Sequence, residues 1–309
     1  MSIHDGEFTR RTLLAQIPAA AAFLMAHEIM AQAPLATNER SAPSKSPTSK
    51  NEARIQSIRL LTAAPLAEMT RFYRDKIGFL IAEETDSRIS FLAGATTLTF
   101  TRVKPEDLRG DGGRGDGGPM YHFAFNIPPN KLRAARDWQL ERSALVAPRP
   151  NLVDSSYTPD VWHFRHWDAH SIFFFDPAFN IVEYIERHTL VDSGAGGRSR
   201  AGAGSGKFTT ADILYASEIG YVFDAAAHSK ATRMVHDKLG LPAYPRGADP
   251  WAMGDERGLI LCLHRKGELW GDQTATPVKW DVFPTESTIR GRKSGVHEFE
   301  GFPYRIRVE

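Results

Sequence analysis

His122 and Glu183 have the side-chain types and the setting of metal ligands. His122 belongs to the segment 121–127, in which every second residue from Phe123 onward is apolar, so the imidazole faces the other side of a predicted strand. Glu183 stands inside the apolar run 181–185, where a carboxylate without a partner is costly to bury. An imidazole and a carboxylate that face one hollow can hold a divalent ion. We therefore predict that both residues are ligands of one metal site.

The segment 162–170 is rich in histidine and lies just before the strand that carries the glutamate. Imidazoles titrate near neutral pH and can act as acids or bases. If the segment is extended, His166 and His170 share one face, with Asp168 between them. We predict that His163, His166 or His170 is the catalytic acid or base, or completes the metal site. The alternative is that each ring is structural and bonds to the backbone.

Three stretches of the chain share one order of predicted elements, which is a strand, a helix and then further strands. In the first stretch, the helix begins near Pro65 and ends at Gly78. In the third, the segment 232–241 (TRMVHDKLGL) matches 70–79 (TRFYRDKIGF) of the first, which indicates an internal repeat. We interpret the stretches as three β-α-β-β-β units that begin near residues 54, 120 and 213.

The second unit resembles the corresponding half of a vicinal-oxygen-chelate domain, the superfamily of glyoxalase I, bleomycin-resistance proteins and extradiol ring-cleaving dioxygenases. In that superfamily, two metal ligands come from the motif H-apolar-x-apolar and from the turn D-P-x-G-N-x-x-E. Here the motif is His122-Phe123-Ala124-Phe125, and the turn runs from Asp176 to Glu183 with Phe179 in place of glycine. The resemblance implies an α+β fold of paired β-α-β-β-β units that form a curved, half-open sheet around a cleft, with a third half-copy unit.

Carried over position by position, the resemblance implies that His122 and Glu183 bind a divalent metal ion (Fe, Mn, Zn or Ni). The matching positions of the first unit are Ser57 and Thr99, so the sets known from dioxygenases and glyoxalases are incomplete. The third unit offers Glu218 and Leu261 at the equivalent places. The residues predicted to line the substrate cleft are Ser57, Thr99, Phe123, Trp162, Phe164 and Trp167.

Composition sets further limits on the function of this 309-residue chain. The net charge of +1 gives no general indication of binding to nucleic acid or to an acidic membrane surface. The single cysteine, Cys262, excludes an intramolecular disulfide. Thr9-Arg10-Arg11 followed by an apolar run resembles a twin-arginine signal, so we predict export to the periplasm or beyond. The apolar run is too short for a stable membrane span.

These features predict the following organisation: a signal at 1–36, a disordered linker at 37–53, a vicinal-oxygen-chelate domain of two units at 54–190, a Gly/Ser linker at 191–207, and a third unit with a tail at 208–309. A third unit leaves one unit without its usual partner. We expect it to pair with a second copy of the chain as a homodimer, to be completed by the tail from Val278 to Val308, or to cap an open sheet edge.

Two functions fit the sequence. The first is an exported, metal-dependent lyase, isomerase or ring-cleaving dioxygenase that acts on a small molecule with adjacent oxygen atoms. The second is a metal-free protein that sequesters a small aromatic or apolar ligand, as bleomycin-resistance proteins do, with affinity supplied by the rings of Phe123, Trp162, Phe164 and Trp167.

Overall fold

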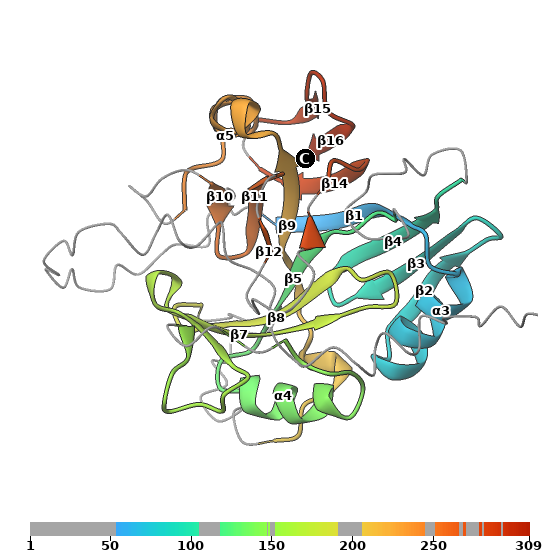
Figure 1. The fold of residues 1–309 in the computed structure, drawn as a ribbon, viewed down its shortest axis with the longest axis vertical. Coiled ribbons are helices and arrows are strands. Elements are labelled where there is room, and N and C mark those ends of the chain that lie inside the picture. Colours follow the sequence, from blue (N-terminus) through green and yellow to red (C-terminus); the bar gives the residue numbers. More distant parts are fainter. Residues whose placement is uncertain are drawn as a thin grey trace, which may run out of the picture.

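The computed structural model describes residues 54–104, 118–146, 148, 152–190, 206–244, 251–265, 268–269, 278–279, 281–291 and 293–309. The predicted signal at 1–36, the linker at 37–53 and most of the linker at 191–207 lie outside these residues. Within them, two seven-stranded mixed sheets carry three helices of the α type (Figure 1). No helix in this part of the chain has both the length and the apolar character that crossing a membrane requires.

The first sheet has the order β15-β16-β14-β1-β4-β3-β2. Its strands are β1 (Arg54–Thr62), β2 (Leu80–Glu84), β3 (Arg88–Ala93), β4 (Thr96–Arg102), β14 (Thr285–Arg290), β15 (Gly295–Glu298) and β16 (Tyr304–Val308). The second sheet has the order β10-β11-β9-β5-β8-β7-β6. Its strands are β5 (His122–Ile127), β6 (Trp162–Phe164), β7 (Ala169–Phe175), β8 (Ile181–Arg187), β9 (Tyr215–Phe223), β10 (Ala252–Asp255) and β11 (Gly258–His264). A separate ribbon joins β12 (Glu268–Leu269) to β13 (Val278–Lys279).

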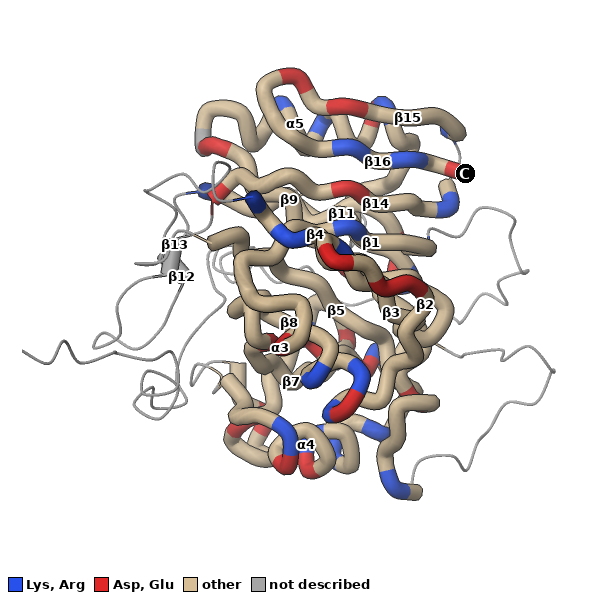
Figure 2. The backbone as a smooth tube through the Cα atoms, turned by 90° about the vertical axis from the view of Figure 1, so that its right-hand side faces the viewer, with Lys and Arg blue, Asp and Glu red and all other residues tan. Residues whose placement is uncertain are grey.

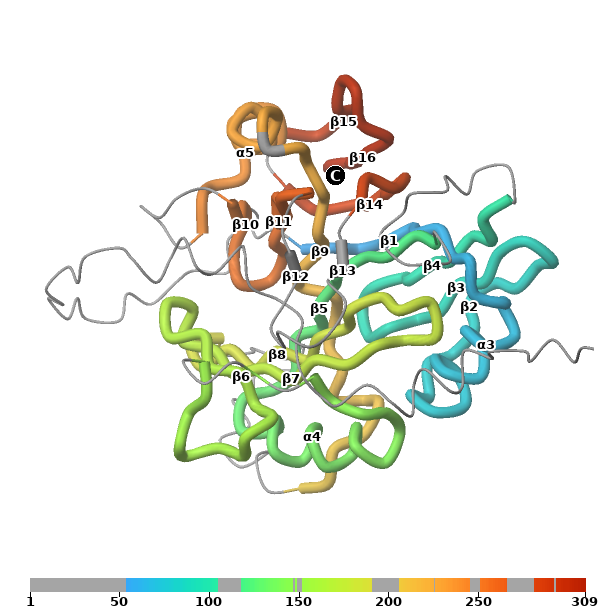
Figure 3. Tube along the Cα trace, viewed as in Figure 1, coloured from blue at the N-terminus to red at the C-terminus, as the bar shows by residue number. Residues whose placement is uncertain are grey.

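The three predicted helices all form, and each follows the first strand of its unit. They are α3 (Leu66–Thr70), which continues as the π-helical turn η1 (Arg71–Lys76), α4 (Leu132–Leu140) and α5 (Ala225–Leu239). Gly78 and Gly240 follow the first and third helices with φ of 89° and 67°, conformations that favour glycine. Two short 3₁₀ turns are η4 (Arg165–Trp167) and η6 (Thr210–Asp212). Figure 3 shows α3, α4 and α5 on the outside of the two sheets.

The first and second units lie in different sheets, although they follow one another along the chain. The second unit pairs with the third, through antiparallel β5 and β9, and the first unit pairs with the tail, through antiparallel β1 and β14. Every residue of β9 is buried, so this strand requires a neighbour on both sides and lies between β5 and β11. In β14, buried and more exposed residues alternate, which suits a strand with one face toward solvent.

The third unit therefore finds its partner within the chain, and the tail does not complete it. Instead β14, β16 and β15 extend the sheet of the first unit. The largest apolar core joins residues of both sheets with α3, α4 and α5, and a second apolar cluster lies on the other side of the sheet that contains β5 and β8. On the side of the molecule in Figure 2, acidic and basic residues are interspersed, as the near-neutral net charge suggests.

Candidate metal centre

His122, Glu183 and Glu218 come together at the centre of the second sheet. The Nε2 atom of His122 lies 3.5 Å from Oε2 of Glu183 and 3.7 Å from Oε2 of Glu218. Each of these residues is at most 2% exposed, and one potential ligand atom from each lies within 4.8 Å of the other two. An imidazole and two carboxylates at this separation form a nitrogen–oxygen set that could hold a divalent ion.

The strand register explains why these side chains share one face. Ala124 of β5 stands opposite Glu183 of β8 and opposite Glu218 of β9, and His122 lies two residues before Ala124. Residues two apart on a strand point to the same side, so all three ligands project from the same face. In β9, an irregularity of register places Ser217 as an extra residue directly before the glutamate. Bulges of this kind re-aim side chains beside functional sites.

His122 is held in one orientation by its second ring nitrogen. Its Nδ1 atom lies 3.1 Å from the carbonyl oxygen of Ile181 on the neighbouring strand. A carbonyl can only accept a hydrogen bond, so Nδ1 carries the proton and donates it. The lone pair of Nε2 is then directed toward the two glutamates. Metal-binding histidines are commonly oriented in this way by a backbone carbonyl.

Arg187 is the cation of the site. It is 1% exposed, and its guanidinium forms an ion pair with Oε1 of Glu218. The guanidinium carbon also lies 5.2 Å from the centre of the Trp167 ring and 5.8 Å from that of Tyr244, within the range of cation–π attraction. The Nε and Nη1 atoms of Arg187 are buried and donate no hydrogen bond to any residue that the structure describes. The site thus contains donor groups besides those that fix Glu218.

Glu183 is under electrostatic strain in the metal-free protein. Burial raises the pKa of its carboxyl group well above the usual value, and the neighbouring charge of Glu218 raises it further. Two buried carboxylates and one arginine leave an excess of negative charge. Either a proton on Glu183 or a bound cation removes this excess, so the donor set fits a divalent ion.

A metal ion held by these three residues would keep coordination positions open, which is typical of catalytic rather than structural metal sites. The fourth equivalent place is Leu261, which lies opposite Gly220 of β9 and supplies no ligand atom. A small hollow next to His122 lies between the start of β5, the end of β9 and the tail. Its lining includes Met120, Val222, Leu263, Asp281 and Tyr304.

The residues predicted for the cleft are divided between several places. Trp162, Phe164 and Trp167 lie in the apolar cluster on the same side of the sheet as His122. Trp167 stacks on Trp251 with ring centres 5.3 Å apart. The placement predicted for Phe123 is wrong, because this residue lies one position from His122 along β5 and packs into the core on the opposite face.

Ser57 and Thr99 do not meet the metal ligands either, because they belong to β1 and β4 of the other sheet. There, Thr99 exchanges a 2.9 Å hydrogen bond with Ser90. Ser57 follows a register irregularity in β1, as Glu218 does in β9. The first sheet therefore repeats the geometry of the second without its ligands.

The histidines of 162–170 do not join His122 and Glu183. The segment is not extended throughout, since β6 gives way to η4 at Arg165 and Asp168 has φ of 46°, which turns the chain back into β7. His163 consequently pairs with His170 across a hairpin, and His170 stands opposite Glu186 of β8. Glu186 is three residues from Glu183 and so faces the other side of the sheet. His166 is exposed in η4. The role predicted for these histidines at the metal site is therefore not supported.

Two functional candidates were not predicted from the sequence. Arg187 lies four residues after Glu183 on one strand, so alternation alone would have placed both on one face. Asp154, which lies beside His163 and His170, belongs to a loop whose position no periodicity reveals. For Glu218, the sequence indicated only that this residue occupies the place in the third unit that is equivalent to a ligand position in the second.

The fold is built from β-α-β-β-β units, and a buried set of one histidine and two glutamates lies at the centre of the second sheet. Solved structures with similar folds include a Bacillus subtilis subsp. subtilis str. 168 protein provisionally described as a dioxygenase. It is 15% identical and has a TM-score of 0.49, with 84% of this chain and 86% of that protein covered. A glyoxalase/bleomycin resistance protein/dioxygenase from Nocardioides is 18% identical, with a TM-score of 0.31 and coverage of 50% and 91%.

Lactoylglutathione lyase from Agrobacterium tumefaciens is another such structure, with 22% identity, a TM-score of 0.30 and coverage of 46% of this chain and 96% of the lyase. No family model matches the sequence, and no curated protein matches it.

Proposed function

We propose that the protein is a metal-dependent enzyme that acts on a small molecule with two adjacent oxygen atoms. The observation that carries this proposal is the convergence of His122, Glu183 and Glu218 within 4.8 Å in a buried position. Two carboxylates are costly to place together in an apolar interior unless a cation accompanies them. A divalent ion held there would polarise the substrate oxygens as a Lewis acid.

The surrounding residues prepare the site for this chemistry. The carbonyl of Ile181 keeps the Nε2 lone pair of His122 directed at the ligand position. Arg187 holds one oxygen of Glu218 and leaves the other directed at His122. The Nε and Nη1 groups of Arg187 suit a negatively charged oxygen of the substrate, since a guanidinium binds such groups with directed hydrogen bonds.

The hollow beside His122 is small and is lined mainly by apolar and aromatic side chains. The aromatic rings of Trp162, Phe164 and Trp167 exclude water from the same side of the sheet. We also propose that the protein is exported, on the basis of the twin-arginine-like segment within residues 1–36.

Metal analysis of the tag-free chain tests this proposal. The protein is stripped with a chelator, loaded with Co²⁺, and compared with His122→Ala and Glu218→Gln. We expect each variant to bind one equivalent less than the wild type, because each loses one of three ligands. A wild-type protein that binds no metal, or variants that bind as much as the wild type, would exclude the metalloenzyme. Retained binding of small aromatic ligands would then indicate a sequestering protein.

A further inference from the structure

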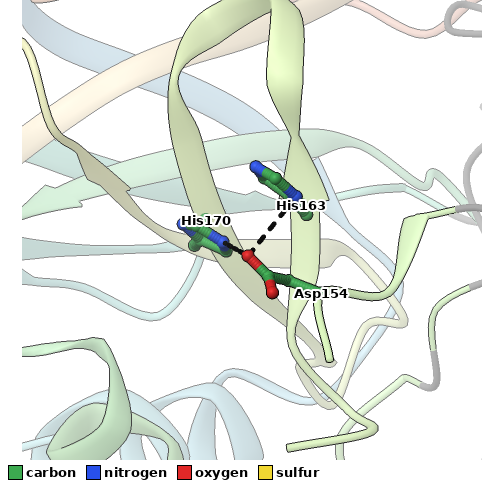
Figure 4. A group of neighbouring side chains, drawn as sticks. All are labelled: Asp154, His163 and His170. Atoms are coloured by element: carbon green, nitrogen blue, oxygen red, sulfur yellow. Dashed lines mark hydrogen bonds and ion pairs between the residues drawn. The ribbon is translucent and has the colours of Figure 1, made fainter. Parts of the chain in front are cut away.

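A second group of metal-ligating side chains lies on the opposite face of the sheet from His122. It consists of Asp154, His163 and His170, which we call the outer cluster (Figure 4). We propose that the outer cluster is a separate binding site for a divalent cation of the zinc type, which fastens the loop before β6 to the hairpin of β6 and β7. This site does not depend on the metal centre proposed above.

The ligand atoms of the outer cluster already converge. Oδ2 of Asp154 lies 3.1 Å from Nε2 of His170 and 3.6 Å from Nδ1 of His163. One ligand atom from each residue lies within 4.8 Å of those of the other two, and Figure 4 shows one carboxylate oxygen of Asp154 close to both rings. Two imidazole nitrogens and one carboxylate oxygen are a set that zinc, nickel, cobalt and copper accept. Asp154 and His163 are partly exposed, so water can reach the site and complete the coordination.

Asp154 is oriented by its own loop. Its Oδ1 atom accepts hydrogen bonds from the backbone N–H of Ser156 at 2.8 Å and from the Ser156 hydroxyl at 2.7 Å. These bonds, with that of His170, hold the pKa of the carboxyl group well below its usual value. The Oδ2 atom is thereby left charged and directed at the two histidines. The loop thus presents one carboxylate oxygen as a fixed ligand.

His170 has the support expected of a metal ligand. Its Nδ1 atom lies 2.8 Å from Nε2 of His188, and Nδ1 of His188 lies 3.5 Å from Oε1 of Glu186. In the structure, Nε2 of His170 donates a 3.1 Å hydrogen bond to Oδ2 of Asp154. A metal at this position would replace that proton, with Nδ1 of His170 then donating to His188, whose other ring nitrogen lies near the Glu186 carboxylate. Hydrogen bonds of this kind fix the tautomer and raise the basicity of metal-binding histidines.

His163 is the ligand that must move. Its ring is nearly parallel to that of His170, with centres 4.3 Å apart and planes at 7°, so their in-plane lone pairs do not meet at one point. The Nδ1 atom of His163 is buried and makes no hydrogen bond to a described residue, so rotation of this ring breaks none at that atom. His170 is fixed by His188 and by Tyr157, whose ring stacks on it at 4.2 Å. A modest rotation of His163 therefore completes the site.

The two sites are separated by the sheet itself. His170 stands opposite Glu186 on the α4 side, whereas Phe173 stands opposite Glu183 on the metal side. Glu186 also accepts a 2.8 Å hydrogen bond from the backbone N–H of Leu132 at the start of α4. Loss of either site is therefore expected to leave the ligands of the other in place.

Zinc titration of a His122→Ala variant, in which the first site is disabled, tests the proposal. We expect one equivalent of Zn²⁺ to bind by calorimetry and to raise the thermal midpoint. Adding His163→Ala or Asp154→Asn should weaken this binding by more than the roughly 10–100-fold cost of losing an outer partner. The matched control is His166→Ala, an exposed histidine three residues from His163, which should bind zinc as the background does.

Asp154→Asn keeps the shape of the side chain, so it tests the site even if the alanine variant folds poorly. The proposal is overturned if the His122→Ala protein binds no zinc. It is also overturned if His163→Ala and Asp154→Asn bind zinc as tightly as His166→Ala.

Discussion

Replacement of Glu183 by glutamine should have opposite effects on the stability of the metal-free and metal-loaded protein. In the metal-free protein, Glu183 and Glu218 lie with ligand atoms within 4.8 Å. Two unit charges at that separation repel each other by about 3.5 kcal/mol at an effective dielectric constant of ~20. Glutamine removes this repulsion and resembles the protonated acid. The nearby Arg187 offsets part of the repulsion, so the gain is smaller than this upper value.

The pH dependence follows from the raised pKa of Glu183. The folded metal-free protein keeps a proton on this group at pH values where the unfolded chain has lost it. The stability of the wild type therefore falls as the pH rises above the usual glutamate range. At pH 4, where the unfolded wild type also begins to hold this proton, we expect Glu183→Gln to change stability little. At pH 9 we expect a thermal midpoint about 3–6 °C above wild type, since 1 kcal/mol shifts a chain of this size by roughly 2–4 °C.

Bound metal should reverse the order of stability, so that the wild type becomes more stable than Glu183→Gln. A ligand present at about 100 times its dissociation constant stabilises the folded state by roughly 2.7 kcal/mol. We expect Co²⁺ to stabilise the wild type by about this amount and to stabilise Glu183→Gln little. The assay is thermal unfolding with and without Co²⁺, in a His163→Ala background so that the outer cluster does not contribute.

The matched control is Glu186→Gln, a buried glutamate on the same strand that faces α4. It should retain the gain from metal. The reasoning is refuted if Glu183→Gln is less stable than wild type at both pH values and still gains stability from Co²⁺.

Three further predictions use other measurements. The affinity of the first site for Co²⁺ should rise with pH by up to about tenfold per pH unit, because the proton on Glu183 competes with the metal. This affinity is measured by competition with a chelator. An affinity independent of pH between 6 and 8 would contradict the prediction. Arg187→Met, which removes the partner of Glu218, should weaken metal binding by roughly 10–100-fold in the same assay, and an unchanged affinity would exclude the orienting role. Asp176→Ala should lower the free energy of unfolding by about 3 kcal/mol or more in urea titrations. It leaves four donors without an acceptor, and three of their hydrogen bonds are buried, those from the hydroxyl of Tyr73 and from the backbone and side-chain amides of Asn180. A loss below about 1 kcal/mol would show that these bonds are replaced.

The common face of His122 and Glu183 could be predicted because both residues lie on regular strands, where alternation fixes the face. The alternation of side chains did not predict the correct face where the chain turns. Asp168 in the left-handed region ends the run at 162–170 and sends His163 and His170 to the other face. The same local rules could not predict which strand edges meet, because β5–β9 and β1–β14 are contacts between distant segments.

In the turn before Glu183, hydrogen bonds override the usual preference for glycine at a position with positive φ. Phe179 has φ of 63°, which costs a non-glycine residue about 1 kcal/mol or more. Asp176 accepts bonds from the backbone N–H groups of Ala178 and Asn180, and Asn180 accepts one from the N–H of Tyr121. These bonds fix the turn whichever residue occupies its left-handed position. The family motif is therefore kept in shape, although its glycine is replaced.

Anomalous diffraction from crystals of the full chain grown with Co²⁺ tests the central claim most directly. The account predicts a peak at the cobalt edge about 2.0–2.2 Å from Nε2 of His122 and from one carboxylate oxygen each of Glu183 and Glu218. Occupied crystals that show no peak among these atoms, with the imidazole hydrogen-bonded directly to a protonated glutamate, would contradict it.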